Sequence, residues 1–521
     1  MGDGFRCPIL AGRNLYLFSD TALLANDIRN LDISCKSLDL EKLIEPDLLS
    51  AKKGDVLLLA MEVPEMFLKD NIEWLEKLKH HRIPVIFYSP HLPDFDEWPD
   101  GITYWITGIS SSEFNDNILE IQAGIVLGNA DRKIADLIEN TKKSGPVLSA
   151  RSASVFLKLM SYQETGRNEI SKLSVINKLT TDSNPEQLIS KKLCEWEHAS
   201  ECFLFPSGMS AVYSMLNLLR NKSKPHVIVI GLLYSDTYSL LMNLGRSYRW
   251  ESEFVGLDRL ESLPQTINSK TAMIFTETIT NPLLEIPDLE RIGEIASEHC
   301  VPFVVDNTVG TPVNCQPLDY NADYVIHSTT KYLSGSNDHA GGAVLVKNSM
   351  DASTLDNFQR CWEMKISNLE SAALWEYMQD FQERMERFNN NGTILAEFLA
   401  EHFAVDFVYH PSLSTNSSYA EAKKLLKGNG GVVSLTLKDE SENALKKFYD
   451  REFSSIIKAP SIGSNLTLIC PYTLLTNYFY TDEELKEINL PRYLIRVSAG
   501  CETKTDGIIE DLDFALKRIV H

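Results

Sequence analysis

The sequence predicts an α/β protein in three parts, in which two strand-and-helix domains are followed by a smaller α+β domain. Short runs rich in Val, Ile and Leu alternate with helix-like stretches along most of the chain. This alternation is typical of a parallel sheet covered by helices. Near the C-terminus the pattern changes to strands at 430–439 and 493–500 and a closing helix at 507–520. A length of 521 residues also predicts two or three domains rather than one.

Residues 1–130 are predicted to form a flavodoxin-like or receiver-like α/β domain. Its expected strands lie at 14–20, 55–61, 83–90 and 102–108, and helix-like stretches lie at 67–81 and 113–128. A phosphorylated receiver needs an acidic cluster and a later lysine. Here Asp20 follows the first strand, but Met61 and Glu62 follow the second, and Thr107 stands where a lysine is needed. We therefore expect a non-catalytic domain for packing, assembly or partner binding, with ligand sensing as the alternative.

Residues 131–149 are polar and helix-like until Gly145-Pro146, which predicts a linker. A large domain is expected at 150–400 and a small C-terminal domain at 401–521, with a long amphipathic helix at 367–404. Ligands bind outside the carboxyl ends of the strands in open sheets of this kind. The strands expected in the large domain are 201–208, 226–231, 271–277, 301–307, 323–329 and 343–348.

The composition argues against partners with a negatively charged surface. The formal net charge is -22 and the sequence pI is near 5.0, so we expect binding neither to nucleic acid nor to membranes. No apolar run reaches the roughly 20 residues of a membrane span, and the N-terminus lacks the pattern of a secretory signal. The nine cysteines are dispersed without metal-ligand spacing, which predicts reduced thiols, no metal site and a cytoplasmic location.

The segment 304–345 carries the strongest chemical signal. A buried strand delivers Asp306 at its tip, and the next strand ends just before Ser328 and Thr330, with Lys331 directly after them. Pyridoxal phosphate needs an amine that forms a Schiff base, an anion facing its ring nitrogen, and donors to its phosphate. Lys331, Asp306 and the two hydroxyls meet these needs.

The spacing D-N-T-x-x-T-P followed by H-S-x-T-K-Y-L-x-G resembles the Cys/Met-metabolism family of pyridoxal-phosphate enzymes, which includes cystathionine γ-synthase. The resemblance covers 184–521 and implies a fold-type I transferase, with a large α/β domain and a small C-terminal α+β domain. It implies that Gly208 and Met209, at the start of a helix, bind the cofactor phosphate through their backbone. It also implies that Tyr234 stacks on the ring and assists proton transfer.

The resemblance gives roles to further residues. Asn281 is expected to bond the phenolic oxygen of the cofactor, with Glu277 supporting the site. Arg496 matches R-x-S-x-G, whose arginine binds the substrate α-carboxylate with two N–H groups. Ser461 lies in a partial match to the S-L-G-G segment that lines the same place, and Asn465 stands where the family usually has glutamate.

One motif of the family is missing. Aligning the family's Y-x-R-x-x-N-P-T on Asn184-Pro185 places Leu179 and Thr181 where a tyrosine and an arginine reach the phosphate of a neighbouring subunit. The clamp is therefore absent or rebuilt. Its replacement is sought among three residues of the preceding segment: Tyr162, Arg167 and Lys172.

The resemblance implies γ-replacement on an amino acid with a side-chain leaving group, as in trans-sulfuration, with an O-acylhomoserine or similar donor. β- or γ-elimination is an alternative, as is γ-replacement with S-adenosylmethionine or a carbon nucleophile in specialised metabolism. A regulatory or scaffold protein is a third hypothesis, against which the intact Lys331, Asp306 and Arg496 argue. A homodimer or homotetramer is implied by the resemblance.

Overall fold

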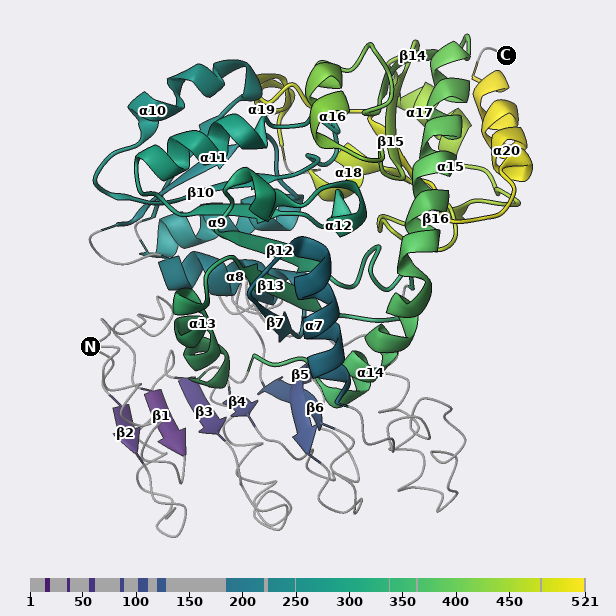
Figure 1. Cartoon of the computed structure of the whole chain (residues 1–521). Coiled ribbons are helices and arrows are strands. Elements are labelled where there is room, and N and C mark those ends of the chain that lie inside the picture. The colour runs from purple at the N-terminus through teal and green to yellow at the C-terminus, as the bar shows by residue number, and fades with distance from the viewer. Residues whose placement is uncertain are drawn as a thin grey trace, which may run out of the picture. The chain divides into compact units, whose positions relative to one another are not determined.

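The structure is a computed structural model that describes short strands within residues 15–127 and nearly all of residues 184–519 (Figure 1). In the second range it leaves out 220–223, 249, 337, 362–363 and 478–479. The chain divides into two compact units, of which the first holds residues 1–182, 243–249 and 367–370. The second unit holds the remaining residues and contains the predicted site residues other than the candidates for the missing clamp.

The first unit contains a six-stranded sheet in the order β2-β1-β3-β4-β6-β5. The first four strands in this order are parallel, as in the flavodoxin-like order 2-1-3-4-5, whereas β6 is antiparallel to both of its neighbours. The receiver-like identity stays a prediction, because the segments between these strands lie outside the described residues. The strands are β1 (Leu15–Phe18), β2 (Cys35–Ser37), β3 (Val56–Ala60), β4 (Val85–Tyr88), β5 (Ile102–Ser110) and β6 (Glu120–Leu127).

Two predictions for this unit need correction. The helix-like stretch expected at 113–128 is wrong over 120–127, which form strand β6. Three β-branched residues, Ile121, Ile125 and Val126, favour an extended chain there and pair with β5. Strand β2 was not predicted, since three residues are too few to show an alternating pattern.

The second unit contains a seven-stranded sheet in the order β7-β13-β12-β11-β10-β8-β9. The last five strands in this order are parallel, and β13 is antiparallel to both neighbours. Six of the seven strands were predicted. Strand β9 was missed because two of the five residues in its sequence, ESEFV, are charged and the strand lies at the sheet edge. The strands are β7 (Glu201–Phe205), β8 (His226–Ile230), β9 (Glu251–Val255), β10 (Thr271–Glu277), β11 (Phe303–Asp306), β12 (Tyr324–Ser328) and β13 (Gly342–Val346).

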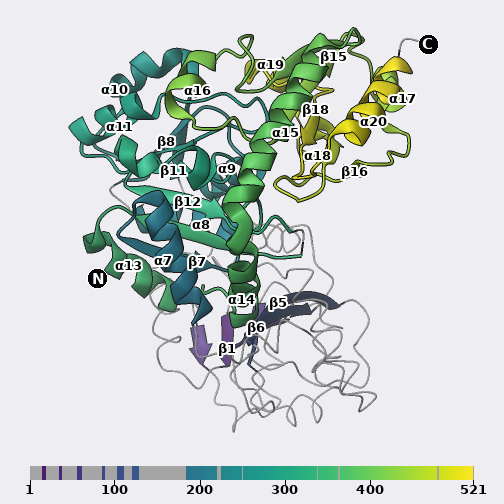
Figure 2. The same cartoon turned by 45° about the vertical axis from the view of Figure 1, so that its right-hand side comes forward.

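Helices lie on both faces of this sheet (Figures 1 and 2). The central strands are almost entirely apolar, and Ile228, Ile274, Phe303 and Val325 have no exposed surface. The main helices are α7 (Pro185–Glu197), α8 (Gly208–Leu219), α9 (Ser235–Tyr248), α11 (Leu289–Glu298) and α13 (Ser349–Cys361). Short turns are η3 (Leu257–Ser262), α10 (Leu263–Thr266), α12 (Thr311–Asn314) and η4 (Pro317–Tyr320).

A long helix joins this sheet to the C-terminal part of the unit. Its sequence was predicted as one helix, but a 3-10 turn, η5 (Met378–Asp380), separates α14 (Asn368–Tyr377) from α15 (Phe381–Glu401). The first part of α15 buries Phe381 and Phe388 in the core of the large domain, and the last part buries Leu395 and Leu399 in a second core. Helix α15 therefore contributes side chains to both hydrophobic cores.

The second core belongs to a five-stranded sheet in the order β14-β15-β18-β17-β16, antiparallel except for its last pair. This is the predicted small α+β domain. Its strands are β14 (Val405–Tyr409), β15 (Val432–Leu437), β16 (Ile457–Lys458), β17 (Leu468–Pro471) and β18 (Ile495–Ser498). Its helices are α16 (Tyr419–Leu425), α17 (Glu442–Tyr449), α18 (Tyr472–Thr476), α19 (Asp482–Glu487) and α20 (Asp506–Lys517).

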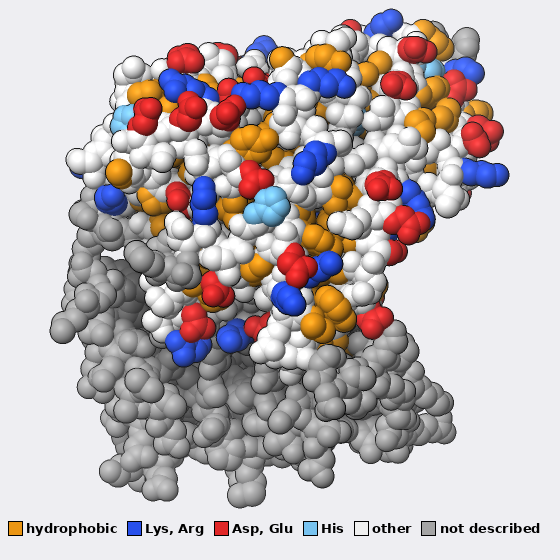
Figure 3. Space-filling view, in the orientation of Figure 1, with side chains coloured by type: hydrophobic (Ala, Val, Ile, Leu, Met, Phe, Trp, Pro, Cys, Tyr) orange, Lys and Arg blue, Asp and Glu red, His pale blue; other side chains and the backbone are white. Residues whose placement is uncertain are grey.

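Charged side chains of both signs are mixed over the visible surface of the described residues (Figure 3). Lys424, for example, lies 2.9 Å from Glu290, and Lys446 lies 2.6 Å from Glu442. Within the residues that the structure describes, none of the helices combines the length and the apolar character needed to cross a membrane.

Candidate active site

Three neighbouring parallel strands bring the predicted polar residues to one edge of the sheet. Glu277 at the end of β10 pairs in register with Asp306 at the end of β11, and Asp306 pairs with Ile326 of β12. Lys331 follows the end of β12 by three residues. The carboxyl ends of parallel strands are where open α/β sheets bind ligands, so the strand pairing itself assembles this group.

Asp306 is held by the loop that follows its own strand. Its Oδ1 atom accepts a hydrogen bond of 2.9 Å from the backbone N–H of Thr308, and the Thr308 hydroxyl accepts one of 2.8 Å from the N–H of Ser328. Burial raises the pKa of the Asp306 carboxyl, against the opposing effects of Thr308 and the nearby His327. A cationic ring nitrogen facing Asp306 would favour its charged form.

Glu277 is buried beside Asp306 and orients two other site residues. Its carboxylate accepts hydrogen bonds from the backbone N–H of Tyr234, at 2.6 Å, and of Asn281, at 3.2 Å. Burial and the adjacent Asp306 hold the pKa of Glu277 well above its usual value. Glu277 therefore fixes the backbones that carry Tyr234 and Asn281, which agrees with its expected supporting position.

Arg496 of β18 enters the site from the small domain. Its Nη1 atom donates to Asn281 Oδ1 at 3.0 Å, and its Nη2 atom donates to the carbonyls of Pro460 and Ser461. The guanidinium carbon lies 4.6 Å from the centre of the Tyr472 ring. Arg496 is 3% exposed, and its Nε atom has no hydrogen-bond partner. A buried N–H group without a partner calls for an acceptor, and a carboxylate of a bound molecule would supply one.

Tyr472 completes this side of the site and was not predicted. It opens helix α18, and its hydroxyl accepts a hydrogen bond of 3.4 Å from Asn281 Nδ2. Burial raises the pKa of Tyr472 to about 12. Nothing in the local pattern around position 472 distinguishes it from a core aromatic residue, so only the folded chain shows that it lies against Arg496 and Asn281.

The Lys331 amine donates a hydrogen bond of 3.1 Å to the Ser461 hydroxyl, which also belongs to the small domain. Burial and the positive charge of Arg496 lower the pKa of Lys331 to about 8, against the opposing charge of Asp236. About one tenth of this amine is therefore neutral at pH 7, far more than at the ordinary lysine pKa of 10.5. The neutral amine is the form that attacks an aldehyde.

The start of helix α8 lies directly against the end of β12. A Cβ atom at Gly208 would come within 2.7 Å of Ser328 Cβ, so only glycine allows this approach. Ser207 and Ser210 close the first turn, where Ser210 N–H donates to Ser207 Oγ at 3.0 Å. The first N–H groups of a helix have no acceptor within it and favour a phosphate. Gly208 and Met209 are thus placed for that contact.

Thr330 makes different contacts from those expected. Its hydroxyl donates a hydrogen bond of 3.3 Å to the carbonyl of Gly341. The same hydroxyl accepts a hydrogen bond of 3.1 Å from the backbone N–H of Gly341. The expected direct contact of Thr330 with a phosphate stays a prediction, as does that of Ser328. The positions considered for the missing clamp lie outside the described residues: Tyr162, Arg167, Lys172, Leu179 and Thr181.

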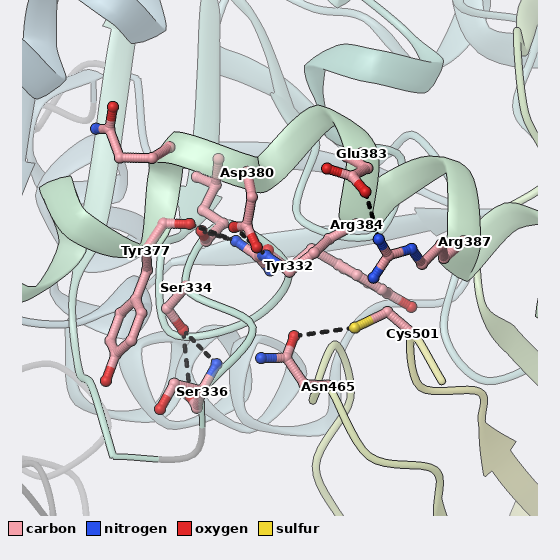
Figure 4. Close-up of polar contacts among 12 residues, drawn as sticks. Tyr332, Ser334, Ser336, Tyr377, Asp380, Glu383, Arg384, Arg387, Asn465 and Cys501 are labelled. Carbon is pink, nitrogen blue, oxygen red and sulfur yellow. Dashed lines mark hydrogen bonds and ion pairs between the residues drawn. The ribbon is translucent and has the colours of Figure 1, made fainter. Parts of the chain in front are cut away.

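Arg384 of α15 holds the turn that follows Lys331 and was also not predicted (Figure 4). Its guanidinium donates to the carbonyls of Tyr332 at 3.0 Å, Leu333 at 3.1 Å and Tyr377 at 2.6 Å. Its Nε atom donates to Asp380 at 2.8 Å. Arg384 is 3% exposed. Two of its hydrogen bonds, to Tyr332 and Leu333, join the turn after Lys331 to the long helix, and the other two, to Tyr377 and Asp380, stay within the helical segment.

A second unpredicted group lies behind Asp306. Glu197 at the end of α7 is fully buried, and its Oε1 atom lies 2.6 Å from His327 Nε2 and accepts a 2.7 Å hydrogen bond from Asn307 Nδ2. His327 directly precedes Ser328, and Asn307 directly follows Asp306. The two strand ends that carry the predicted cofactor residues are therefore tied to the same carboxylate.

These residues fit pyridoxal phosphate: a partly neutral lysine, a carboxyl at the neighbouring strand end, and a helix start with no room for a side chain. Together with the seven-stranded sheet and the small α+β domain they define a pyridoxal-phosphate-dependent enzyme of fold type I. A family model described as "Cys/Met metabolism PLP-dependent enzyme" matches residues 140–517. The chain belongs to this family, and its cofactor is pyridoxal 5'-phosphate.

Individual relatives support the same assignment. The chain is 32% identical over 336 residues to the cystathionine beta-lyase of Coxiella burnetii, covering 64% of this chain and 86% of the relative. It is 32% identical over 312 residues to the cystathionine gamma-synthase of Mycobacterium leprae, covering 60% of this chain and 79% of the relative. The structure of cystathionine gamma-synthase from Xanthomonas oryzae pv. oryzae in complex with cystathionine matches with a TM-score of 0.62 and 28% identity, covering 65% of this chain and 87% of that chain.

Proposed function

We propose that this enzyme catalyses γ-replacement on an amino acid with a side-chain leaving group, as a cystathionine γ-synthase does. The observation that carries the proposal is that Lys331 and Arg496 lie close enough in one site for the charge of Arg496 to act on Lys331. The lysine amine has a pKa near 8, and the arginine has a buried N–H without a partner. The first supplies a base and nucleophile, and the second supplies a receptor for the α-carboxylate of an amino acid.

When bound, pyridoxal phosphate withdraws electrons from the α-carbon of an attached amino acid. The residues of this chain would then divide the remaining tasks. Arg496 binds the α-carboxylate, and Lys331 moves protons at the α- and β-carbons. Asp306 keeps the ring nitrogen protonated, and Ser461 orients the lysine amine.

The other contacts hold the cofactor in place. Tyr234 would stack on the ring, and Asn281 would bond its phenolic oxygen. Gly208, Met209, Ser328 and Thr330 would surround the phosphate. Asn281 already accepts from Arg496, so it links the cofactor's oxygen with the group that binds the substrate.

Product analysis tests the reaction. With an O-acylhomoserine and cysteine, γ-replacement releases the acyl group as a carboxylate and forms cystathionine. Elimination instead yields 2-oxobutanoate, ammonia and the same carboxylate. Relatives named as lyases match at about the same identity as the synthase, so elimination is the second candidate. Formation of 2-oxobutanoate without cystathionine would replace the first proposal by the second.

We also propose a homodimer or homotetramer in the cytoplasm. A cytoplasmic location agrees with the cysteines of the described part, which are free thiols: Cys194, Cys202, Cys300, Cys315, Cys470 and Cys501. The resemblance supports the oligomer, and light scattering of the purified protein measures its mass. A particle with the mass of one chain would contradict this part of the proposal.

A further inference from the structure

A carboxylate that the proposed reaction does not use lies next to Tyr234. Asp236 stands in the first turn of α9, and its Oδ2 atom accepts a hydrogen bond of 2.9 Å from the Tyr234 hydroxyl. The family motif noted above reads Y-G-G-T, whereas this chain reads Y-S-D-T from Tyr234. The chain therefore adds a negative charge at a position where the family motif has no side chain.

This carboxylate acts on the reacting centre. Its charge opposes the lowering of the Lys331 pKa by burial and Arg496, so it lies within electrostatic reach of the amine. It also raises the pKa of the Tyr234 hydroxyl, in addition to the larger effect of burial. The start of a helix stabilises a negative side chain in the first turn. Asp236 is thus a charged group of the site rather than a distant surface residue.

The other charged groups of the site have assigned tasks. Arg496 is expected to bind the α-carboxylate, and Lys331 to carry protons. Burial raises the pKa values of Glu277 and Asp306, and Glu277 bonds two backbone N–H groups. With the α-carboxylate at Arg496 and the α-carbon beside Lys331, as proposed above, the donor side chain would extend toward Tyr234 and Asp236, which lie within electrostatic reach of Arg496 and Lys331 respectively.

We propose that Asp236 is a specificity-determining residue that favours donors with a positively charged γ-substituent, such as a sulfonium, over donors with an anionic one. The proposal rests on the proposed function. When the bond from Cγ to the substituent breaks, its electron pair leaves with the substituent. A sulfonium departs as a neutral thioether, whereas an acyl ester departs as a carboxylate and places a second negative charge beside Asp236. Succinyl and phosphoryl esters carry that charge before the bond breaks.

The test compares Asp236→Asn with the wild-type holoenzyme. Asparagine keeps an acceptor oxygen for the Tyr234 hydroxyl and removes only the charge. The panel is S-adenosylmethionine, O-acetylhomoserine, O-succinylhomoserine and O-phosphohomoserine. The readouts are kcat/KM and the dissociation constant from the change in the cofactor spectrum. We expect the wild type to favour the sulfonium over the two anionic esters, and Asp236→Asn to reduce that ratio by about tenfold or more.

Asp258→Asn is the matched control, because it removes one carboxylate from an exposed position in η3, and it should leave the ratio unchanged. If Asp236→Asn does not hold cofactor, Asp236→Glu, which keeps the charge, is compared with Asp236→Gly, which restores the family's residue. An unchanged ratio in the charge-removing variant, or a wild type that favours the anionic esters, overturns the proposal. A wild type without visible cofactor absorbance overturns the proposed function itself.

Discussion

The Arg496 side chain connects the large and small domains of the second unit. It belongs to the small domain, yet it bonds Asn281 of the large domain at 3.0 Å and packs over Tyr472. The N–H on its Nε atom is buried and has no hydrogen-bond partner. The residue therefore binds protein on one side and is available to a ligand on the other, which is the arrangement expected of a carboxylate receptor.

Arg496→Ala should weaken substrate binding while the protein keeps its cofactor. Removing a buried charged hydrogen-bond partner costs about 2–5 kcal/mol, so we expect kcat/KM to fall by at least about thirtyfold and visible absorbance to remain. Arg492→Ala is the control, because Arg492 pairs with the exposed Asp482, and it should behave as the wild type. Equal loss of activity in both variants would contradict the assignment.

The low pKa of Lys331 predicts the pH dependence of cofactor loading. Only the neutral amine reacts with the aldehyde, so the rate at which cofactor-free protein takes up pyridoxal phosphate should rise with pH, with its midpoint near the pKa of about 8. Arg496→Ala removes a positive charge that lowers this pKa, so its midpoint should lie higher. Stopped-flow absorbance measures both rates. A wild-type midpoint near the ordinary lysine value of 10.5 would contradict this account.

The same pKa has a consequence for the stability of the cofactor-free protein. The unfolded chain holds the Lys331 proton up to its ordinary pKa of 10.5, whereas the folded chain loses it at about 8. Between these values the unfolded state binds more protons, so the contribution of Lys331 to stability increases as pH rises. Below pH 8 both states are protonated, and the folded state must bury the charge.

At the scale of elements, the turn after β12 depends on helix α15. Arg384→Ala would leave the carbonyls of Tyr332 and Leu333 without their donors in a buried place. Breaking a buried charged interaction typically costs about 3–5 kcal/mol, so we expect a large loss of stability by chemical denaturation and a weaker affinity for cofactor.

The control for this element is Arg387→Ala, one turn further along α15. Arg387 is 40% exposed and pairs with Glu383, so its loss should change stability by less than about 0.5 kcal/mol. Arg384→Lys should recover part of the stability, because it keeps the charge. If Arg384→Ala were as stable as Arg387→Ala, the turn would not depend on Arg384.

The contact between α8 and β12 gives another prediction at this scale. A methyl group at Gly208 would collide with Ser328 Cβ at 2.7 Å, so Gly208→Ala should cost about 1–3 kcal/mol and reduce cofactor affinity. Adding Ser328→Gly removes the two closest atoms, Ser328 Cβ and Oγ, and leaves the backbone Cα at 3.1 Å, so it should recover part of the stability. Denaturation of the single and double variants measures this. A double variant no more stable than Gly208→Ala would show that the contact is not the cause.

The strands and the lysine motif could be predicted because their signals are local. Runs of β-branched residues mark the central strands, and the spacing between Asp306 and Lys331 marks the family. Strands β9 and β6 could not be predicted in the same way. Charged residues interrupt the apolar pattern of β9, and the sequence of β6 mixes polar and apolar residues without a clear alternation. Tyr472 lies more than 50 residues from Asn281, and Arg384 lies more than 50 residues from Tyr332 and Leu333. No local pattern encodes such contacts.

At the scale of the whole molecule, the second unit contains the predicted site residues other than the clamp candidates, and these candidates all follow Asn129 in the sequence. Deleting residues up to Asn129 should therefore leave cofactor binding intact. The visible absorbance per chain of the shortened protein tests this, and light scattering shows whether its assembly changes. Loss of all bound cofactor in a folded, shortened protein would show that the first part of the chain is required for the site.

The most direct test of the account is the visible spectrum of the purified protein beside that of Lys331→Ala. Lys331 follows the end of β12 and donates to Ser461, and we propose that its amine attaches the cofactor covalently. The account predicts a visible absorption band in the wild type that is absent in Lys331→Ala, with the far-ultraviolet spectrum unchanged. The same band in both proteins would contradict the account.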